Sequence, residues 1–115
     1  MRMVSGEEVD FPRKSWYSNG MNLHNVKTFE LAGITYPVKY VREVNEDAGT
    51  NGMAFLDKGR VDILESLSPD KRGQVFCHEL THCILSTMGE TALNENEKFV
   101  DLFGSFLHQA LKTVK

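Results

Sequence analysis

Hydrophobic and polar residues alternate along residues 28–44 and again along residues 53–65, and both stretches are rich in β-branched and aromatic side chains. Each stretch also contains a turn signal, which is Gly33 in the first and residues 57–60 in the second. Two β-hairpins are therefore predicted, and Pro37 indicates that its strand lies at an edge or begins there. The expected result is a small antiparallel or mixed β-sheet.

The spacing of apolar residues becomes helical after residue 68, and a first helix is predicted over residues 69–88. Ser68 is a favourable N-cap, and Pro69 fits the first helical position, where no amide donor is needed. Gly89 suits a left-handed C-cap after the last turn. At about 100° per residue, one face of this helix gathers the bulky apolar side chains that should point to the core. These are Phe76, Cys77, Leu80, Ile84 and Met88.

A second helix is predicted over residues 95–113, after a short loop. Asn94 is expected to be its N-cap, and Glu97, three residues later, completes a capping-box pattern. Apolar residues run through the rest of this helix, so we expect it to be well buried. Together these elements predict an α+β fold in which a small sheet packs on two main helices.

Residues 1–27 show no clear period and form an N-terminal extension of uncertain structure, followed by one domain over residues 28–115. A chain of 115 residues suits a single modest core. The net charge of −3 argues against a nucleic-acid partner. No apolar run is long enough to span a bilayer, and the first residues lack the apolar centre of a signal peptide. We therefore predict a cytoplasmic protein that does not contact a membrane.

Three residues with reactive side chains are expected to be mainly structural. Cys77 and Cys83 lie six residues apart on the first helix and point in different directions, so no disulfide is expected between them. Neither belongs to a CxxC pair, which argues against a cysteine-type zinc site. Cys77 should pack as a small buried hydrophobe, whereas Cys83 could lie near a site because it follows His82. His24 is expected to be an exposed loop residue.

The first helix carries the clearest chemical motif, because His78, Glu79 and His82 form an HExxH pattern. Residues four apart lie on the same side of a helix, so both imidazoles can reach one metal ion. Glu79 is offset by roughly 100° and flanks that ion without competing for it. A zinc hydrolase needs this arrangement, with two nitrogen ligands and a carboxylate that accepts a proton from water.

The second helix offers a third ligand. Glu97 and Asp101 are four residues apart and share a face, so Glu97 could complete a three-ligand zinc site while Asp101 orients a histidine. Two plainer readings stay open, in which Glu97 is only a capping residue and Asp101 only an exposed carboxylate. Glu95 is a rival ligand without an acid four residues later. His108 lies too far along the helix, by roughly 10 Å of rise, to bind the same ion.

HExxH on one helix, followed by ExxxD on the next, resembles the gluzincin metallopeptidases. The compact order of hairpin, HExxH helix and glutamate helix resembles more specifically the small ImmA/IrrE-like metallopeptidases of phages and mobile elements. The resemblance covers about residues 28–112 and implies a minimal zincin-like domain. It also implies that His78, His82 and Glu97 bind Zn²⁺, that Glu79 is the general base, and that Asp101 supports a ligand.

The sequence thus leads us to expect a zinc metallopeptidase that hydrolyses a peptide or protein substrate, with the strand at residues 61–65 as a cleft edge that holds the substrate by strand addition. One alternative is a non-catalytic zinc-binding protein that acts through a protein partner. A second is a metal-free domain in which HExxH is accidental. The sequence leaves the oligomeric state open.

Overall fold

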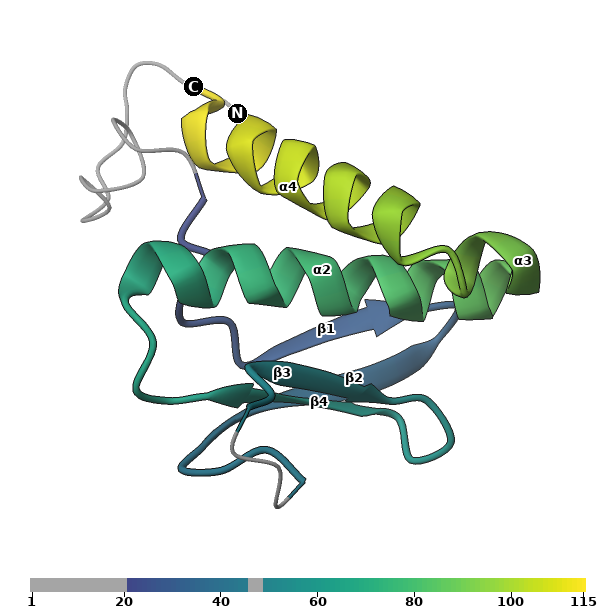
Figure 1. Ribbon diagram of the computed structural model, residues 1–115, viewed down its shortest axis with the longest axis horizontal. Helices are drawn as coiled ribbons and strands as arrows, with labels where there is room; N and C mark the ends of the chain where they lie inside the picture. Colours follow the sequence, from purple (N-terminus) through teal and green to yellow (C-terminus); the bar gives the residue numbers. More distant parts are fainter. Residues whose placement is uncertain (1–20, 46–48) are drawn as a thin grey trace.

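The computed structural model describes residues 21–45 and 49–115 (Figure 1). Most of the predicted N-terminal extension therefore lies outside the described residues. The strands are β1 (Thr28–Leu31), β2 (Ile34–Val41), β3 (Gly52–Phe55) and β4 (Arg60–Leu64), and the helices are α2 (Pro69–Met88), α3 (Thr91–Asn94) and α4 (Glu97–Thr113). Figure 1 shows the sheet as one layer, α2 lying across it, and α4 on the far side of α2. The predicted α+β class is confirmed.

Both predicted hairpins are present. β1 pairs antiparallel with β2, and β3 pairs antiparallel with β4. Ala32 and Gly33 form the first turn with φ values of 49° and 81°, and Gly59 has φ 65° in the second. Consecutive left-handed residues suit a two-residue hairpin turn, because their twist matches that of the strands they join.

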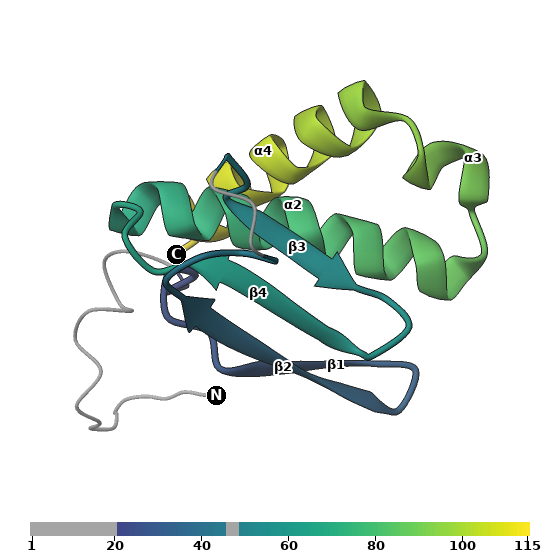
Figure 2. The ribbon, with the colours of Figure 1, turned by 60° about the horizontal axis from the view of Figure 1, so that its bottom comes forward.

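The order of the strands corrects one expectation. The sheet runs β1-β2-β4-β3, and β2 pairs parallel with β4 in the register Val38↔Val61. The strand at residues 61–65 was expected to form a cleft edge, but β4 is an interior strand and β3 is the edge (Figure 2). Val61, Asp62 and Ile63 are buried in succession, which agrees with the interior position of β4. Alternation within a hairpin does not determine which of its strands meets the next hairpin.

Helix α2 begins and ends as predicted. The Ser68 hydroxyl accepts a hydrogen bond from the Lys71 amide, and Gly89 takes a left-handed conformation with φ 76°. Both cysteines are free and fully buried, and burial raises the pKa of the Cys77 thiol to about 11 and that of Cys83 to about 12. Met88 is 64% exposed, contrary to its expected place on the apolar face. It occupies the last turn of the helix.

The start of α4 differs from the prediction. Asn94 is the last residue of the short helix α3, and Asn96 is the N-cap of α4, where its side chain accepts a hydrogen bond from the Phe99 amide. Glu97 is therefore the first residue of α4, two positions too early for the predicted capping box. The extra turn of α3 moves the helix start and leaves the side chain of Asn94 free for another contact.

Helix α4 is also less buried than its composition predicts. Val100 and Gly104 are buried, whereas Leu102, Phe103 and Phe106 are 49%, 45% and 69% exposed. We call these three residues the outer stripe. The helix packs mainly against α2, which covers one of its sides (Figures 1 and 2). Of the described elements, α2 is its main partner, and the outer stripe keeps a large exposed area.

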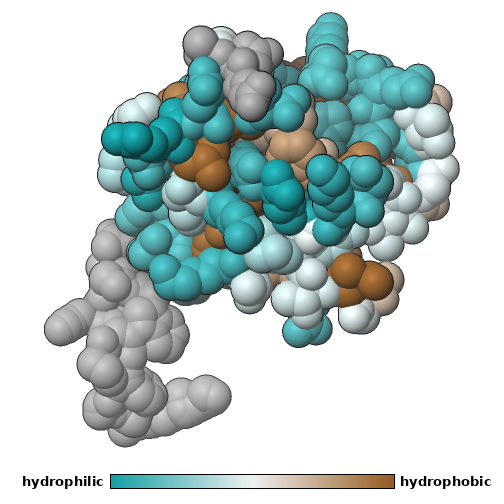
Figure 3. Space-filling view, turned by 90° about the horizontal axis from the view of Figure 1, so that it is seen from below, coloured by the Kyte–Doolittle hydropathy of each residue, from teal (hydrophilic) through white to brown (hydrophobic). Residues whose placement is uncertain are grey.

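The opposite side of the molecule is more polar. Figure 3 views the molecule from the side of the sheet, where hydrophilic residues predominate and hydrophobic residues are scattered. The core instead lies between the sheet and α2, where Val38, Val61 and Ile63 pack with Phe76 and Cys77. Among the described residues, no helix combines the length and apolar character needed to cross a membrane.

Candidate metal centre

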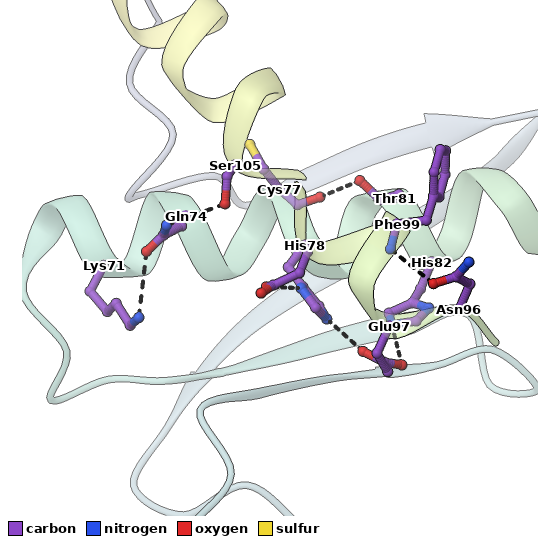
Figure 4. A network of polar contacts seen from close by, with 11 residues as sticks. Lys71, Gln74, Cys77, His78, Thr81, His82, Asn96, Glu97, Phe99 and Ser105 are labelled. Atoms are coloured by element: carbon purple, nitrogen blue, oxygen red, sulfur yellow. Dashed lines mark hydrogen bonds and ion pairs between the residues drawn. The ribbon is translucent and has the colours of Figure 1, made fainter. Parts of the chain in front are cut away.

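The two histidines of the HExxH motif lie on the same side of α2, one helical turn apart. Their ring centroids are 5.1 Å apart. Both side chains are partly exposed, at 25% for His78 and 17% for His82. They point toward the first turn of α4, so a residue from a second element can approach both rings at once (Figure 4).

That residue is Glu97. Its Oε1 lies 3.6 Å from Nε2 of His78, and its Oε2 lies 3.5 Å from Nε2 of His82. Two ligand atoms that each bind a tetrahedral zinc ion at about 2.0–2.1 Å lie roughly 3.3–3.5 Å apart. The three donor atoms lie within 4.8 Å of one another and form a group that could hold one metal ion.

The other ring nitrogens are held by oxygen atoms. Nδ1 of His78 lies 3.3 Å from Oδ1 of Asp101, and Nδ1 of His82 lies 2.6 Å from Oδ1 of Asn94. An oxygen acceptor at Nδ1 favours the tautomer that donates its proton there and leaves the Nε2 lone pair available. Both imidazoles are therefore oriented to offer Nε2 toward Glu97, as metal-binding histidines require.

Asn94 is a site residue that the sequence did not identify. It was assigned as an N-cap, because an asparagine three residues before a glutamate matches a capping box. In the structure the chain makes the short turn of α3, and the Asn94 side chain reaches back to α2. Asp101, by contrast, was predicted to orient a histidine, and it lies beside His78.

Gly104 allows the two helices to come close enough for these contacts. A Cβ atom at this position would lie 3.0 Å from Cα of His78 and 3.1 Å from its backbone nitrogen. Such distances are shorter than ordinary carbon contacts, so a larger residue would push α4 away from α2. Gly104 therefore permits the close packing of α4 on α2.

Glu79 turns toward the sheet. The residue is only 8% exposed, and its carboxylate accepts a hydrogen bond from the Ala54 amide of β3. Burial raises the pKa of this carboxyl, opposed by the two histidines and by the Ala54 hydrogen bond. Gly52 allows this close approach, because a Cβ atom there would clash with the side chain of Val75.

The edge strand β3 directs some of its backbone groups away from β4, beside the site. The Leu64 amide donates a hydrogen bond to the Asn51 carbonyl, which fixes the alternation of paired and outward-facing positions along β3. Gly52 and Ala54 therefore direct their backbone groups away from β4. The Ala54 amide meets Glu79, and the remaining groups lie along the exposed edge.

A cavity of about 330 Å³ opens next to the histidines, between α2, α4 and the start of β3. His78, Glu79 and Gly52 line it near the candidate metal centre. Lys71, Gln74 and Ser105 line it farther along α2. Its wall is thus mainly polar, and of the three candidate ligands it includes His78.

Other candidates lie elsewhere. His108 packs against Gly73 near the start of α2, as expected for a residue too far away to ligate. Cys83 is fully buried, so it does not reach the cavity surface. The group that can hold one ion contains Glu97 and not the rival Glu95.

We found no significant match for this chain among protein-family models, curated proteins or solved structures. The case for a site therefore depends on its own geometry. The structure brings together all five predicted site residues, and their roles in binding and catalysis stay predictions.

Proposed function

We propose that this chain is a metal-dependent peptidase, most simply a zinc enzyme of the gluzincin type. Its zincin-like arrangement resembles the small ImmA/IrrE-like metallopeptidases. One observation carries the proposal: two imidazoles anchored through Nδ1 direct Nε2 toward the carboxylate of Glu97, beside the buried Glu79. Chance ion pairing alone gives no reason for both rings to be anchored in this way.

We assign metal binding and general-base catalysis to different residues of the site. A divalent ion held by His78, His82 and Glu97 would polarise a carbonyl group and lower the pKa of water to about 7. Glu79 accepts a proton from the attacking water and transfers it to the leaving amine. The buried Glu79 carboxylate lines the cavity together with His78, which places it beside the proposed ligands.

Edge strand β3 takes the substrate-holding role first expected for residues 61–65. An extended peptide can add to β3 through the outward backbone groups of Gly52 and the carbonyl of Ala54. Because Glu79 already meets the Ala54 amide, a peptide on this edge passes beside the proposed base. The substrate is therefore a peptide or protein segment that can become extended.

Metal content tests the first half of the proposal. Purified wild-type protein should contain about one zinc ion per chain, and His78→Ala and Glu97→Ala should lose most of it. Glu95→Ala is the matched control, since it removes a neighbouring acid outside the ligand group. Absence of metal from the wild type, with none taken up from added zinc, would contradict the proposal.

Activity tests the second half. Hydrolysis of an unfolded protein substrate by the zinc-loaded wild type should fall by about 10²- to 10⁴-fold in Glu79→Gln, which keeps the shape of the side chain but removes the base. The zinc content of this variant should match that of the wild type. Full activity in Glu79→Gln would rule out the proposed general base.

A second candidate function is a non-catalytic metal protein that acts through a protein partner. The exposed outer stripe of α4 favours it, because contiguous exposed aromatic residues are typical of protein-binding surfaces. In that case zinc binds with the same ligands, but the wild type and Glu79→Gln show the same absence of hydrolysis. The two assays above therefore separate the two functions.

A further inference from the structure

A polar chain of side chains extends the cavity away from the metal centre. The Lys71 ammonium donates a hydrogen bond to Oε1 of Gln74 at 3.4 Å, and Nε2 of Gln74 donates to the Ser105 hydroxyl at 3.5 Å. Figure 4 shows Lys71, Gln74 and His78 in order along α2, with Ser105 approaching from α4. This polar row of Lys71, Gln74 and Ser105 lies along the cavity wall beside His78.

Lys71 supplies a positive charge that is not paired with any carboxylate of the described residues. Among the described residues, no carboxylate lies within ion-pair distance of its ammonium group, whose hydrogen-bond partner is the neutral Gln74. The neighbouring acid Asp70 is already paired with Lys112 at 2.7 Å, which holds the pKa of Asp70 below its ordinary value. The ammonium therefore keeps hydrogen-bond donors for a ligand.

The two acidic residues that line the cavity, Glu79 and Asp101, lie at its end beside His78. Asp101 lies against Nδ1 of His78, and Glu79 accepts the Ala54 amide. Both carboxylates are thus engaged near the metal centre, and Lys71 with the Ser105 hydroxyl sets the character of the other end. Donors grouped at one end of a polar cavity favour an anionic group of the substrate.

The helical rise from His78 to Gln74 suits a substrate carboxylate that lies close to the cleaved bond. Gln74 lies four residues before His78, which is about 6 Å of helical rise. An extended peptide advances about 3.3 Å per residue, so a residue one or two positions from the reacting carbonyl comes level with Gln74 and the Lys71 ammonium. The long lysine side chain can follow a carboxylate over this short span.

We propose that this end of the cavity is a specificity subsite that binds a substrate carboxylate beside the scissile bond, with Lys71 as its cation and Ser105 as a second donor. The inference rests on the proposed peptidase function and defines its substrate class. The carboxylate can belong to a glutamate or aspartate side chain, or to the free C-terminus of the peptide.

Matched peptides distinguish these sources. One set carries Glu, Gln or Lys next to a single cleavable bond, and each peptide is made with a free or an amidated C-terminus. The wild type should cleave its preferred acid form with kcat/KM about tenfold above the neutral form, which corresponds to about 1.4 kcal/mol. A preference that follows the side chain identifies an acidic residue, and one that follows the terminus identifies a terminal carboxylate.

Variants of Lys71 test the cation itself. Lys71→Met keeps the length and helix propensity of the side chain and should abolish the tenfold preference. Lys71→Glu should reverse the preference toward the Lys peptide. Lys27→Met is the matched control, because this exposed lysine precedes β1 at the sheet edge remote from β3. Equal preference in the wild type and Lys71→Met would overturn the proposal.

A binding measurement separates this subsite from the peptidase function. Zinc-loaded Glu79→Gln, with and without Lys71→Met, is titrated with the same peptides by fluorescence anisotropy. Tenfold tighter binding of the acid peptide that depends on Lys71 supports the subsite even if the wild type cleaves nothing. Cleavage without any carboxylate preference rejects the subsite and leaves the peptidase function standing, and failure of every peptide to bind or be cleaved rejects both.

Discussion

Replacement of Asn94 is the sharpest test of how this site holds its histidines. In the structure, Oδ1 of Asn94 lies 2.6 Å from Nδ1 of His82 and fixes the ring with Nε2 toward Glu97. Asn94→Ala removes this acceptor, so the His82 ring can rotate and change tautomer. Loss of such an outer partner typically costs 10- to 100-fold in metal affinity. We expect the Kd for zinc to rise by that factor, or about 1.4 to 2.7 kcal/mol.

The same substitution should affect folding less than metal binding. Asn94 is only partly buried, and one hydrogen bond contributes about 1 kcal/mol to the free energy of unfolding. Asn94→Asp should keep zinc affinity close to that of the wild type, since a carboxylate accepts the same Nδ1 hydrogen bond. Asn25→Ala, an exposed residue before β1, is the matched control.

Competition with a chromophoric chelator measures the zinc affinity of the four proteins, and urea unfolding of the metal-free proteins measures stability. The expected order of zinc affinity places wild type, Asn94→Asp and Asn25→Ala together, with Asn94→Ala well below them. If Asn94→Ala binds zinc as tightly as Asn25→Ala does, then Asn94 does not orient His82 and the anchoring interpretation is wrong.

Three further predictions concern α4. Val100→Ala should lower the free energy of unfolding by roughly 2–3 kcal/mol, because Val100 is fully buried. Phe106→Ser on the outer stripe should change it by less than about 0.5 kcal/mol. Urea denaturation measures both, and equal losses would contradict the observed burial. Gly104→Ala should lower the free energy of unfolding by roughly 1–3 kcal/mol and weaken zinc binding, because the new methyl group meets the backbone of His78. Urea denaturation and chelator competition measure the two effects, and unchanged values would refute the close approach of the helices. Burial lowers the pKa of His108, so the unfolded chain takes up its proton more readily as the pH falls below about 6.5. Stability should therefore decrease between pH 7 and pH 5 by more in the wild type than in His108→Gln, and equal slopes in urea titrations would show that His108 does not contribute.

The sequence predicted those features that depend on neighbours along the chain. The turn at Gly33 and the alternation around it gave the first hairpin, and Ser68 and Gly89 gave the ends of α2. The spacing of His78 and His82 placed both rings on one side of a helix. Each of these follows from local geometry with a fixed period, so no knowledge of the tertiary fold was needed.

Features that depend on tertiary contacts were not predictable in the same way. The interior position of β4 follows from its parallel pairing with β2, which no local pattern specifies. The outer stripe of α4 was expected in the core, because composition records how apolar a helix is and not how many partners cover it. Asn94 could not be recognised, since the turn that redirects it is a single short helix.

The candidate site lies in the single interface between α2 and α4, so a few residues of these two helices form it. His78 and His82 belong to α2, which the sheet supports, whereas Glu97 and Asp101 belong to α4, which packs mainly on α2. An ion bound by residues of both helices would cross-link α2 to the N-terminal turn of α4. Metal affinity and the docking of α4 are then thermodynamically linked, because binding to the folded site stabilises the helix pair that forms it. One glycine contact, two anchoring oxygen atoms and a single turn of α3 thus suffice to bring the candidate ligands together.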